Sequence, residues 1–590
     1  MWSMRRLLPA SVLVAAMCAQ LVLGSTDDAP PGAGTDVALA ADLAPGAPSV
    51  VVYGGTPAGV AAAVAAARHR ATVVLLAEGT TVGGMMSNGI SASDVGATHA
   101  VTGIARTFFD RIKSYYGGAS EWQFEPRIAE RVLVRMLSEA GVEVRRSQPL
   151  LGVRMDGRRI ACVQVASGDV CAPNFIDASY TGDLLAAAGV PFRLSMSDLR
   201  SYGENMALRR NWTEVLRVTQ DQWSNAAAAF RNNPYVRVEA SLPDYDDVYA
   251  RGTPSLTYRL CVTSDPARRI PFTKAPGSDA WLASFRVIAR TSNPVVTVRS
   301  NGTIASDMYT LAKIPGGKYD VNAGYSSFTN LPAPAGYFTT PGGRAAANKL
   351  MRDYIQTFFW FVQNDATVPP AVREKFRPFG LCADEFVANG GWPYQPYVRE
   401  GRRIVGRDVL TVGDIYIDRL KSDTVAVGSY YVDGKTSQWL FTSGALYRDV
   451  GVFSSAPVYE IPFAAMVPTT GSVTNLLAPV GLSTSPTAYG SVRMEPQYMG
   501  LGQAAGLATA LASREALSVA ALPASRVQSL LRYDGVAYTA RSVCLRSPLA
   551  ARRTYGFSST CALIPTSPDA RTAAAPGDLS LPGFRPGNGG

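Results

Sequence analysis

The most regular hydrophobic pattern of the chain lies near its N-terminus, where two short apolar runs flank a segment rich in alanine and valine. Residues 50–53 are continuously apolar and stop at a glycine-rich turn, residues 60–68 follow with a helix-like composition, and residues 72–77 are apolar again. Glu78 ends the second run. Short apolar runs separated by a helix-length segment are typical of parallel strands that are buried on both faces. We therefore predict a βαβ unit over residues 50–78.

The turn of this unit has the composition of a nucleotide-binding loop. Glycines let the backbone approach a pyrophosphate, the start of the helix presents free N–H groups, and an acid about 20 residues downstream binds ribose hydroxyls. Glu78 occupies that downstream position, and Thr56 stands where the G-x-G-x-x-G spacing has its middle glycine, a role that Gly55 can share. An ordinary glycine turn in a βαβ crossover is the alternative. The loop residues expected to bind a dinucleotide are Gly54, Gly55, Thr56, Pro57, Ala58 and Gly59.

Two later segments extend this nucleotide-binding hypothesis. The glycine pair Gly83-Gly84 follows the predicted ribose-binding acid, and a pair at this position suits FAD better than NAD. Residues 160–176 predict a hairpin and then a buried strand, which ends at Asp177 and Ala178 before an alanine-rich helix. A buried strand that ends in small and acidic residues is a second place where a loop can meet the cofactor.

The remaining pattern divides the chain into segments. Residues 127–140 have helical periodicity, and residues 498–513 have the composition of a small-residue helix that packs closely on its neighbours. Between residues 196 and 390 the alternation of strands and helices is lost, and Pro, Tyr and Trp become frequent. We expect a FAD-binding domain in two parts, residues 49–195 and 391–540, a substrate or cap domain over residues 196–390 and a peripheral tail over residues 541–590.

The N-terminus indicates export. Residues 1–24 combine paired arginines, an apolar segment and small residues, as a secretory signal does, and residues 25–48 have the composition of a disordered leader. The apolar segment is slightly short for a membrane span, so we expect a secreted or periplasmic protein without stable membrane insertion, with a retained signal anchor as the alternative. The net charge of +10 comes from arginines that are scattered without a basic run, which argues against nucleic-acid binding.

Cysteine usage agrees with export. Six cysteines remain when the predicted signal is removed, and an even number in an exported chain favours disulfides, with buried free thiols as the alternative. No pair has C-x-x-C spacing, so zinc and thioredoxin-like sites are not expected. The expected pairs are Cys162 with Cys171 near one hairpin, Cys544 with Cys561 in the tail and, as the remainder, Cys261 with Cys382.

Several sequence blocks together resemble the FAD-dependent oxidoreductase family, whose members are often labelled xanthan-lyase-related. The resemblance covers nearly the whole chain after the leader and is far more specific than the glycine loop alone. The blocks are Tyr53 to Val60, Ser93 to Gly96, Phe124 to Pro126, Ile176 to Leu184, Tyr202 to Glu204, Tyr258 to Cys261, Asp384 to Phe386, Tyr397 to Arg403, Arg493 to Pro496 and Gly502 to Gly506.

The resemblance implies a glutathione-reductase-like FAD domain of the α/β class, assembled from discontinuous segments, with an inserted α+β substrate or cap domain over the flavin. It also implies residue roles. The glycine loop lines the pyrophosphate, and Glu78 holds the adenosine ribose. The start of the late helix stabilises the negative charge of the reduced flavin. Residues implied to follow the cofactor toward the flavin or to lie near its ring are Gly83, Gly84, Met85, Arg493, Met494 and Gly502.

The chain departs from its relatives where catalysis is expected. The family typically has one histidine after a Ser-x-Ser segment and another after a Gly-Ser-Tyr block, but Pro486 follows Ser483-Thr484-Ser485 here, and none follows Gly428-Ser429-Tyr430. Of the two histidines in the chain, His69 ends the first predicted helix and only His99 lies near the predicted flavin. We expect His99 to be the base for hydride removal or a covalent attachment point for the flavin, with a loop-wall role as the alternative.

Other residues are candidates for the same chemistry. A guanidinium fork matches the geometry of a carboxylate, so a group of arginines can grip an acidic substrate. The same arginines can instead form buried structural ion pairs with Glu400 or Asp408. These arginines are Arg399, Arg402 and Arg403, and the further candidates for the base are Tyr430, Asp433, Glu204 and Arg399.

Together these observations predict an exported FAD-dependent oxidoreductase. It takes hydride from a small, polar, hydroxyl-bearing substrate related to sugars or sugar alcohols, and the sequence does not identify its electron acceptor. One alternative is a secreted flavoprotein-fold binding or structural protein with reduced or no catalysis, which the missing histidines favour. A polysaccharide lyase, suggested by the family label, is a second alternative. Lyase chemistry needs no flavin, so an intact dinucleotide loop argues against it.

Overall fold

The computed structural model describes residues 46–194, 202, 204, 212–243, 255–322, 329–334, 336–339, 341–434, 438–449 and 453–546. The predicted signal, nearly all of the predicted leader, most of the predicted tail and Cys561 lie outside the described residues. No helix within the described ranges is long and apolar enough to cross a membrane.

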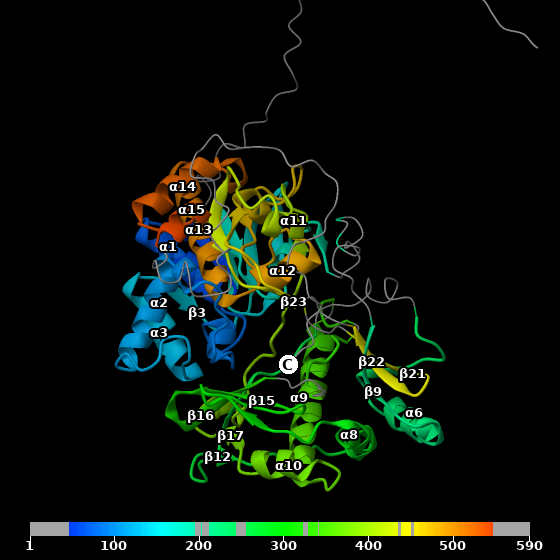
Figure 1. Cartoon of the computed structure of the whole chain (residues 1–590). Helices are drawn as coiled ribbons and strands as arrows, with labels where there is room; N and C mark the ends of the chain where they lie inside the picture. The colour runs from blue at the N-terminus through cyan, green and yellow to red at the C-terminus, as the bar shows by residue number, and fades with distance from the viewer. Residues whose placement is uncertain are drawn as a thin grey trace, which may run out of the picture. The chain divides into compact units, whose positions relative to one another are not determined.

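The predicted FAD-binding part contains a parallel sheet, of which Figure 1 labels the strand β3. Among the described residues it has five strands in the order β25-β7-β1-β2-β3, and every neighbouring pair is parallel. β1 and β2 are buried throughout, which explains why their sequences are continuously apolar. β25 comes from a segment far along the chain, so the α/β class and the discontinuous assembly are confirmed. The strands are β1 (Val50–Tyr53), β2 (Val73–Leu76), β3 (Glu143–Arg145), β7 (Asn174–Asp177) and β25 (Leu476–Leu477).

Two helices with small side chains, α1 (Pro57–Arg68) and α13 (Glu495–Arg514), pack against each other beside this sheet. A Cβ atom on Gly502 would lie 2.1 Å from the carbonyl oxygen of Ala58, and one on Gly506 would lie 2.1 Å from that of Ala62. Because residues four apart share one face of a helix, the two glycines form one flat contact for α1. The predicted close packing of this helix is confirmed, and Gly502 takes part in it.

Further elements complete this part of the chain. The helix predicted over residues 127–140 is α3 (Pro126–Glu139), whose apolar face is buried. Three antiparallel strands, β4 (Leu150–Asp156), β5 (Arg159–Val165) and β6 (Gly168–Cys171), form the predicted hairpin region. The other elements used below are α2 (Gly103–Tyr115), α4 (Asp183–Ala187), α11 (Val412–Tyr416), α12 (Pro486–Val492), α14 (Ala524–Tyr533), α15 (Ala540–Leu545), β19 (Thr424–Gly428) and β24 (Tyr459–Pro462).

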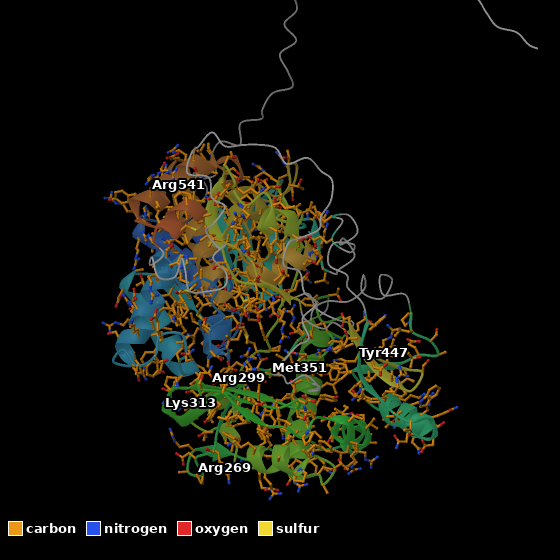
Figure 2. All side chains as sticks on the ribbon, viewed as in Figure 1. Arg269, Arg299, Lys313, Met351, Tyr447 and Arg541 are labelled. Carbon is orange, nitrogen blue, oxygen red and sulfur yellow. A yellow bond between two sulfur atoms is a disulfide. The ribbon has the colours of Figure 1, made fainter. Side chains whose placement is uncertain are left out.

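The predicted cap segment contains an antiparallel sheet and, among its described residues, four α-helices, one of which is α6 (Trp223–Arg231). Within the described ranges this sheet has seven strands in the order β12-β17-β11-β16-β15-β14-β13. The long helix α9 (Pro341–Asn364) packs with α8 (Asp279–Thr291) and α10 (Pro370–Phe376), and its Met351 is fully buried (Figure 2). The strands are β11 (Leu260–Thr263), β12 (Arg269–Ile270), β13 (Thr297–Val298), β14 (Ile304–Ala305), β15 (Thr310–Ile314), β16 (Lys318–Asn322) and β17 (Gly380–Cys382).

A smaller sheet joins the two predicted domains in a way that the sequence pattern did not indicate. Its order is β10-β21-β22-β9, so strands on both sides of the boundary predicted near residue 391 pair with one another. The predicted domain limits themselves stay a prediction. The strands are β9 (Trp212–Arg217), β10 (Val236–Val238), β21 (Trp439–Thr442) and β22 (Ala445–Asp449).

Two of the expected disulfides are present. Cys162 and Cys171 face each other on β5 and β6, as expected for a bridge across a hairpin. Cys261 on β11 is bonded to Cys382 on the neighbouring strand β17, which joins residues 121 positions apart. The third expected pair includes Cys561, which lies outside the described residues.

Buried charges link the cap sheet to the FAD-binding part. Lys318 on β16 is fully buried, and its Nζ lies 2.8 Å from Glu125, 2.8 Å from Asp384 and 2.6 Å from Glu385. Arg127, at the start of α3, contacts the same carboxylates. Three acids this close have the composition of a metal site, but the ammonium group lies among them and, together with Arg127, balances most of their charge. This cluster is therefore an ionic contact between the cap sheet and α3.

Candidate functional site

The glycine loop after β1 is shaped by close backbone contacts. Gly54 has a φ of +109°, and a Cβ atom there would lie 2.5 Å from the backbone of Ala178. A Cβ atom on Gly59 would lie 2.0 Å from the carbonyl oxygen of Gly54. The carbonyl oxygen of Gly55 accepts hydrogen bonds from the N–H groups of Gly83 and Gly84, at 2.7 and 3.1 Å. The predicted loop, its downstream glycine pair and Ala178 therefore meet at the carboxyl ends of β1 and β7.

Thr56 replaces the expected middle glycine because it caps the helix. Its hydroxyl accepts a hydrogen bond from Gly59 N–H at 3.1 Å and donates one to Ala178 O at 2.7 Å. Its φ of −76° is open to any residue, so the backbone does not require glycine there. The N–H groups of Thr56 and Ala58 donate to no acceptor among the described residues. Two free donors at the positive end of α1 suit a pyrophosphate.

Glu78 follows β2 at the edge where the glycine loop lies, as predicted. Burial raises the pKa of Glu78 to about 8, with a further increase from Asp183 that Arg344 partly opposes. Arg344, on α9 of the cap segment, binds both oxygens of Asp183 at 2.7 and 2.9 Å. The predicted ribose-binding acid thus has a cationic neighbour from the cap, which sequence reasoning missed because no motif marks Arg344.

The segment after the glycine pair is held by a tyrosine and a buried acid. Gly83 has a φ of +108°, and Met85 is fully buried. Met85 N–H donates to Tyr180 Oη at 2.9 Å, and the Tyr180 hydroxyl donates to Glu495 Oε1 at 2.7 Å. Glu495 is the first residue of α13, so this chain of contacts ties the predicted flavin-side loop to the start of that helix. Sequence reasoning placed Tyr180 and Glu495 in family blocks but gave them no role.

Asp177, predicted as cofactor-binding, is engaged by its own loop. Its Oδ1 accepts hydrogen bonds from Ser179, and its Oδ2 accepts one from Leu185 N–H at 2.8 Å. Burial raises the pKa of Asp177 to about 6. The structure therefore shows Asp177 ordering the segment between β7 and α4, whose backbone at Ala178 contacts the glycine loop.

A cluster of buried polar residues gathers near the start of α13. Arg493 forms an ion pair with Asp433 at 2.7 Å and donates a hydrogen bond to the hydroxyl of Tyr397. The guanidinium carbons of Arg399 and Arg493 lie 4.8 and 5.8 Å from the centre of the Tyr397 ring. Burial raises the pKa of Tyr397, although both guanidinium groups oppose this increase. These residues come from two family blocks and the strand after Tyr430, and we call them the Tyr397 cluster.

Tyr430 lies next to this cluster. It is buried, its backbone carbonyl accepts a hydrogen bond from the Ser491 hydroxyl, and its ring packs on Tyr431 with centroids 4.2 Å apart. Burial raises the pKa of Tyr430 well above its usual range, and Asp94 adds to this increase. Asp94 also acts electrostatically on Arg493 and Tyr397. The structure thus brings the predicted Arg399, Tyr430 and Arg493 into one region. Met494, also predicted, is the buried N-cap residue of α13.

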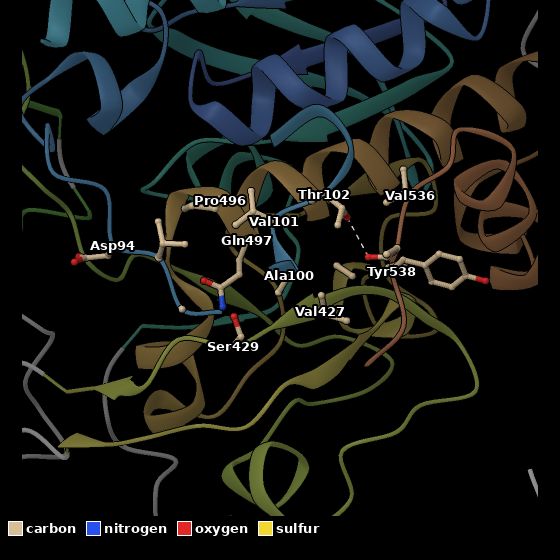
Figure 3. Close-up of a pocket in the computed structure, with 16 residues that line it drawn as sticks. Asp94, Ala100, Val101, Thr102, Val427, Ser429, Pro496, Gln497, Val536 and Tyr538 are labelled. Atoms are coloured by element: carbon tan, nitrogen blue, oxygen red, sulfur yellow. Dashed lines mark hydrogen bonds between the residues drawn. The ribbon is translucent and has the colours of Figure 1, made fainter. Parts of the chain in front are cut away.

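A pocket lies beside this region, between the loop at residues 94–102 and the first turn of α13 (Figure 3). Ala97 N–H donates to the Ser429 hydroxyl at 3.0 Å, and the Thr102 hydroxyl donates to Ala537 O at 3.1 Å. Gln497 also lines the pocket, and its buried amide nitrogen has no partner within the described ranges. Most of the remaining wall is made of valine and alanine.

His99 lines a second pocket, which shares Val101 and Thr102 with the first. It shares that pocket with Arg106, Glu121, Trp122 and Arg546. Its pKa is lowered by burial, and its Nε2 has no hydrogen-bond partner in the part of the chain that the structure describes. The structure does not bring the imidazole to the Tyr397 cluster, and the catalytic role predicted for it stays a prediction. His69 ends α1, as predicted, and contacts Asp534 at 3.0 Å.

The three arginines predicted to grip a carboxylate have different partners. Arg403 forms a buried ion pair with Glu400 at 2.8 Å, as the structural alternative predicted. Arg402 pairs with Asp183 at 2.9 Å instead of with Glu400 or Asp408. Arg399 donates to Ser255 O and, at 2.8 Å, to Asn330 Oδ1, and it forms no ion pair with a described residue. Two of the three are thus structural.

Glu495 gives this region a testable pH dependence. Its Oε2 is buried without a partner among the described residues, and burial raises its pKa to about 8. Between about pH 4.5 and pH 8 the folded state keeps this proton while the unfolded state releases it, so the contribution of Glu495 to stability falls as the pH rises. Because glutamine does not titrate, we expect Glu495→Gln to remove this decrease in stability with rising pH. Relative to the natural chain, the stability of the variant should rise by up to about 4 kcal/mol between about pH 5 and pH 8.

Thermal unfolding of both proteins without bound ligand, across this pH range, measures the difference. Asp110→Asn is a suitable control, because Asp110 lies on α2, 61% of its side chain is exposed and its ionic partner is an arginine. A constant difference between Glu495→Gln and the natural chain at every pH would mean that Glu495 does not hold its proton in the fold.

The chain was compared with curated proteins, solved structures and sequence families. No curated protein matches the chain. The solved structures that match include NikD, an unusual amino acid oxidase of nikkomycin biosynthesis, at 17% identity over 25% of this chain and 56% of NikD, with a TM-score of 0.19. The flavin-dependent brominase Bmp2 matches at 11% identity over 82% of this chain and 83% of Bmp2, with a TM-score of 0.33.

Thioredoxin reductase from Lactococcus lactis matches at 20% identity over 22% of this chain and 35% of the reductase, with a TM-score of 0.16. The chain therefore spans about half the length of NikD and about a third of this reductase. Residues 49–531 match the sequence family described as FAD dependent oxidoreductase. The chain belongs to the FAD-dependent oxidoreductase family, and its cofactor is FAD.

Proposed function

We propose that the protein takes hydride from a small, polar, hydroxyl-bearing substrate related to sugars or sugar alcohols. The observation that carries this proposal is the Tyr397 cluster, a buried set of hydrogen-bonding groups beside the first turn of α13. Such a set suits a substrate with hydroxyl groups, because buried donors and acceptors require partners. Bound FAD supplies the two-electron acceptor for this chemistry.

The nucleotide cradle fits the cofactor. The free N–H groups of Thr56 and Ala58 would hold the pyrophosphate, and Glu78 would hold the ribose. Gly54 and Gly59 leave no room for a side chain between the loop and its neighbours, so the backbone itself forms the wall of the cradle. Gly83 and its neighbours continue this wall toward Tyr180 and the start of α13.

Within the Tyr397 cluster we assign complementary roles. Asp433 balances the charge of Arg493 and fixes its orientation, so one guanidinium nitrogen is directed at the hydroxyl of Tyr397. A phenol that accepts from a guanidinium keeps its own proton to donate, and the raised pKa of Tyr397 keeps it neutral. Tyr397 would therefore orient a substrate hydroxyl. Arg493 precedes the start of α13. Its positive charge and the positive end of the helix dipole would both stabilise negative charge on the reduced flavin.

The test is anaerobic reduction of the FAD-bound protein by a panel of sugars, sugar alcohols, hydroxy acids and amino acids, followed as bleaching of the flavin. We expect bleaching by hydroxyl compounds. Bleaching only by amino acids would contradict the substrate class. Bound flavin that no compound bleaches would favour a binding or structural protein with a flavoprotein fold.

Tyr397→Phe tests the role of the cluster. The variant loses only the hydroxyl that Arg493 contacts, so we expect FAD content to stay unchanged. The rate of flavin reduction by the best substrate of the panel should fall roughly 100-fold, as is typical when a positioned hydrogen-bonding group is removed. Stopped-flow measurement of the bleaching rate gives the comparison.

His99→Ala serves as the matched variant for this test, because the imidazole lines the second pocket. We expect its reduction rate to stay close to that of the natural chain. A large loss in His99→Ala together with an unchanged rate in Tyr397→Phe would instead support His99 as the base.

We also propose that the protein is exported. The two disulfides support this proposal, because such bonds persist in oxidising compartments and are rare in the cytosol. Cell fractionation and N-terminal sequencing are the test. We expect protein in the medium or periplasm that starts near residue 25, and cytosolic protein with an intact N-terminus would contradict export.

A further inference from the structure

We propose that Arg399 binds a carboxylate group of the substrate, so that the preferred substrates are hydroxy acids or sugar acids. This inference rests on the proposed function and narrows its substrate class. It starts from one observation: Arg399 is a buried guanidinium that forms no ion pair with a described carboxylate.

The burial of Arg399 is nearly complete, with an exposed fraction of 2%. Its described contacts are neutral, namely Ser255 O, Ser255 Oγ at 3.5 Å, Asn330 Oδ1 at 2.8 Å and the face of Tyr397. Its Nε has no hydrogen-bond partner among the described residues. Buried charges are normally paired, because an unpaired charge in a protein interior is costly.

Three other buried arginines are each paired with a carboxylate. Arg493 is paired with Asp433 at 2.7 Å, and Arg259 is paired with Asp320 at 2.6 Å. Arg403 is paired with Glu400 at 2.8 Å. Burial lowers the pKa of Arg399 to about 10, and Arg493 contributes to this decrease. Arg399 therefore remains charged at neutral pH. Asp433 partly opposes the decrease, but no described acid is in hydrogen-bonding contact with Arg399.

The position of Arg399 places the substrate carboxylate at the proposed site. Arg399 and Arg493 both lie against the ring of Tyr397, whose hydroxyl Arg493 contacts. Ser255 and Asn330 come from the cap segment and hold two of the guanidinium nitrogens in place. A ligand that reaches Tyr397 is therefore close to Arg399.

The chemistry of the free donors selects a carboxylate. Guanidinium and carboxylate groups are planar and form paired charge-assisted hydrogen bonds, whereas a neutral hydroxyl leaves the charge unbalanced. A substrate with a hydroxyl for Tyr397 and a carboxylate for Arg399 satisfies both residues. Neutral sugars and sugar alcohols satisfy only the first.

Binding to the oxidised, FAD-bound protein tests this assignment without turnover. The probes are two pairs that differ in charge and carry no hydroxyl group to oxidise, acetate with acetamide and propionate with propionamide, titrated by calorimetry and by the change in flavin absorbance. We expect each acid to bind at least about 10-fold more tightly than its neutral partner. Equal binding of acid and neutral partner would overturn the proposal, whatever the variants show.

Arg399→Met and Arg399→Lys locate the effect. We expect Arg399→Met to weaken binding of the acids roughly 10- to 100-fold and to leave binding of the neutral probes unchanged. Arg399→Lys keeps the positive charge, so it should keep part of the affinity for the acids. Arg419→Met is the matched control, because Arg419 is also buried and has an unpartnered nitrogen among the described residues, but lies after α11. FAD content of each variant shows whether the fold is kept. Equal loss of acid binding in Arg399→Met and Arg419→Met would overturn the assignment.

The outcomes separate this inference from the proposed function. Tight, Arg399-dependent acid binding without any flavin bleaching would contradict hydride transfer and keep the carboxylate site. Bleaching by neutral alcohols with no preference for acids would keep the proposed function and overturn the carboxylate site.

Discussion

Replacing Gly59 with alanine is expected to abolish stoichiometric FAD binding. The added Cβ atom would lie 2.0 Å from the carbonyl oxygen of Gly54, which is a backbone atom of the same loop. Because backbone cannot yield as a flexible side chain does, α1 must move away from β1, and the free N–H groups of Thr56 and Ala58 move with it. We expect the affinity for FAD to fall roughly 100-fold or more, measured by flavin fluorescence titration of the FAD-free protein.

Gly79→Ala is the matched control for Gly59→Ala. Gly79 follows Glu78 directly, an added Cβ atom there has open space around it, and its φ is not in the left-handed region. We expect its affinity for FAD to equal that of the natural chain. Unchanged FAD binding in Gly59→Ala would mean that the loop does not hold the pyrophosphate.

Replacing Lys318 with methionine is expected to lower the free energy of unfolding by about 3–5 kcal/mol. The ammonium group is fully buried among Glu125, Asp384 and Glu385. Without it, Arg127 alone faces three carboxylates, and their mutual repulsion in a buried site is no longer balanced. Chemical unfolding of the natural chain and the variant measures the difference.

Lys349→Met gives the comparison for Lys318→Met. Lys349 pairs with Asp353 on the exposed face of α9, and 78% of its side chain is exposed. Surface pairs of this kind contribute little, so we expect a change within about 0.5 kcal/mol. A loss of similar size in both variants would show that Lys318 acts as an ordinary surface charge. A more stable Lys318→Met that binds a divalent cation would show that the three acids form a metal site.

The parts of the fold that the sequence predicted are those with local causes. The apolar runs of β1 and β2, the capped start of α1 and the periodicity of α3 depend on residues close together in the chain. The close packing of α13 was also predictable, because small residues four positions apart leave a flat helix face. The disulfide of Cys162 with Cys171 follows from one hairpin.

The parts that were not predicted depend on contacts between distant segments. No local pattern indicates that β21 and β22 pair with β9 and β10 across the expected domain boundary. Arg344 reaches Asp183 near Glu78 from the cap, and this approach depends on where α9 lies. Motif spacing marked Thr56 as a departure, but only the structure shows that its hydroxyl caps α1.

The candidate site divides in the same way. The glycine loop and Glu78 were predictable because dinucleotide binding requires fixed residue types at fixed spacing. The Tyr397 cluster draws on separate blocks, and sequence alone did not distinguish Arg399, which forms no ion pair with a described residue, from Arg402 and Arg403. Only their observed partners, Asp183 and Glu400, separate them from Arg399.

The most direct test of the central claim is the visible absorption spectrum of the purified chain. We predict the absorption bands of bound flavin, with about one FAD per chain, because the glycine loop and the free N–H groups at the start of α1 form a nucleotide cradle. Protein that is folded but colourless, and that takes up no added FAD, would contradict this account.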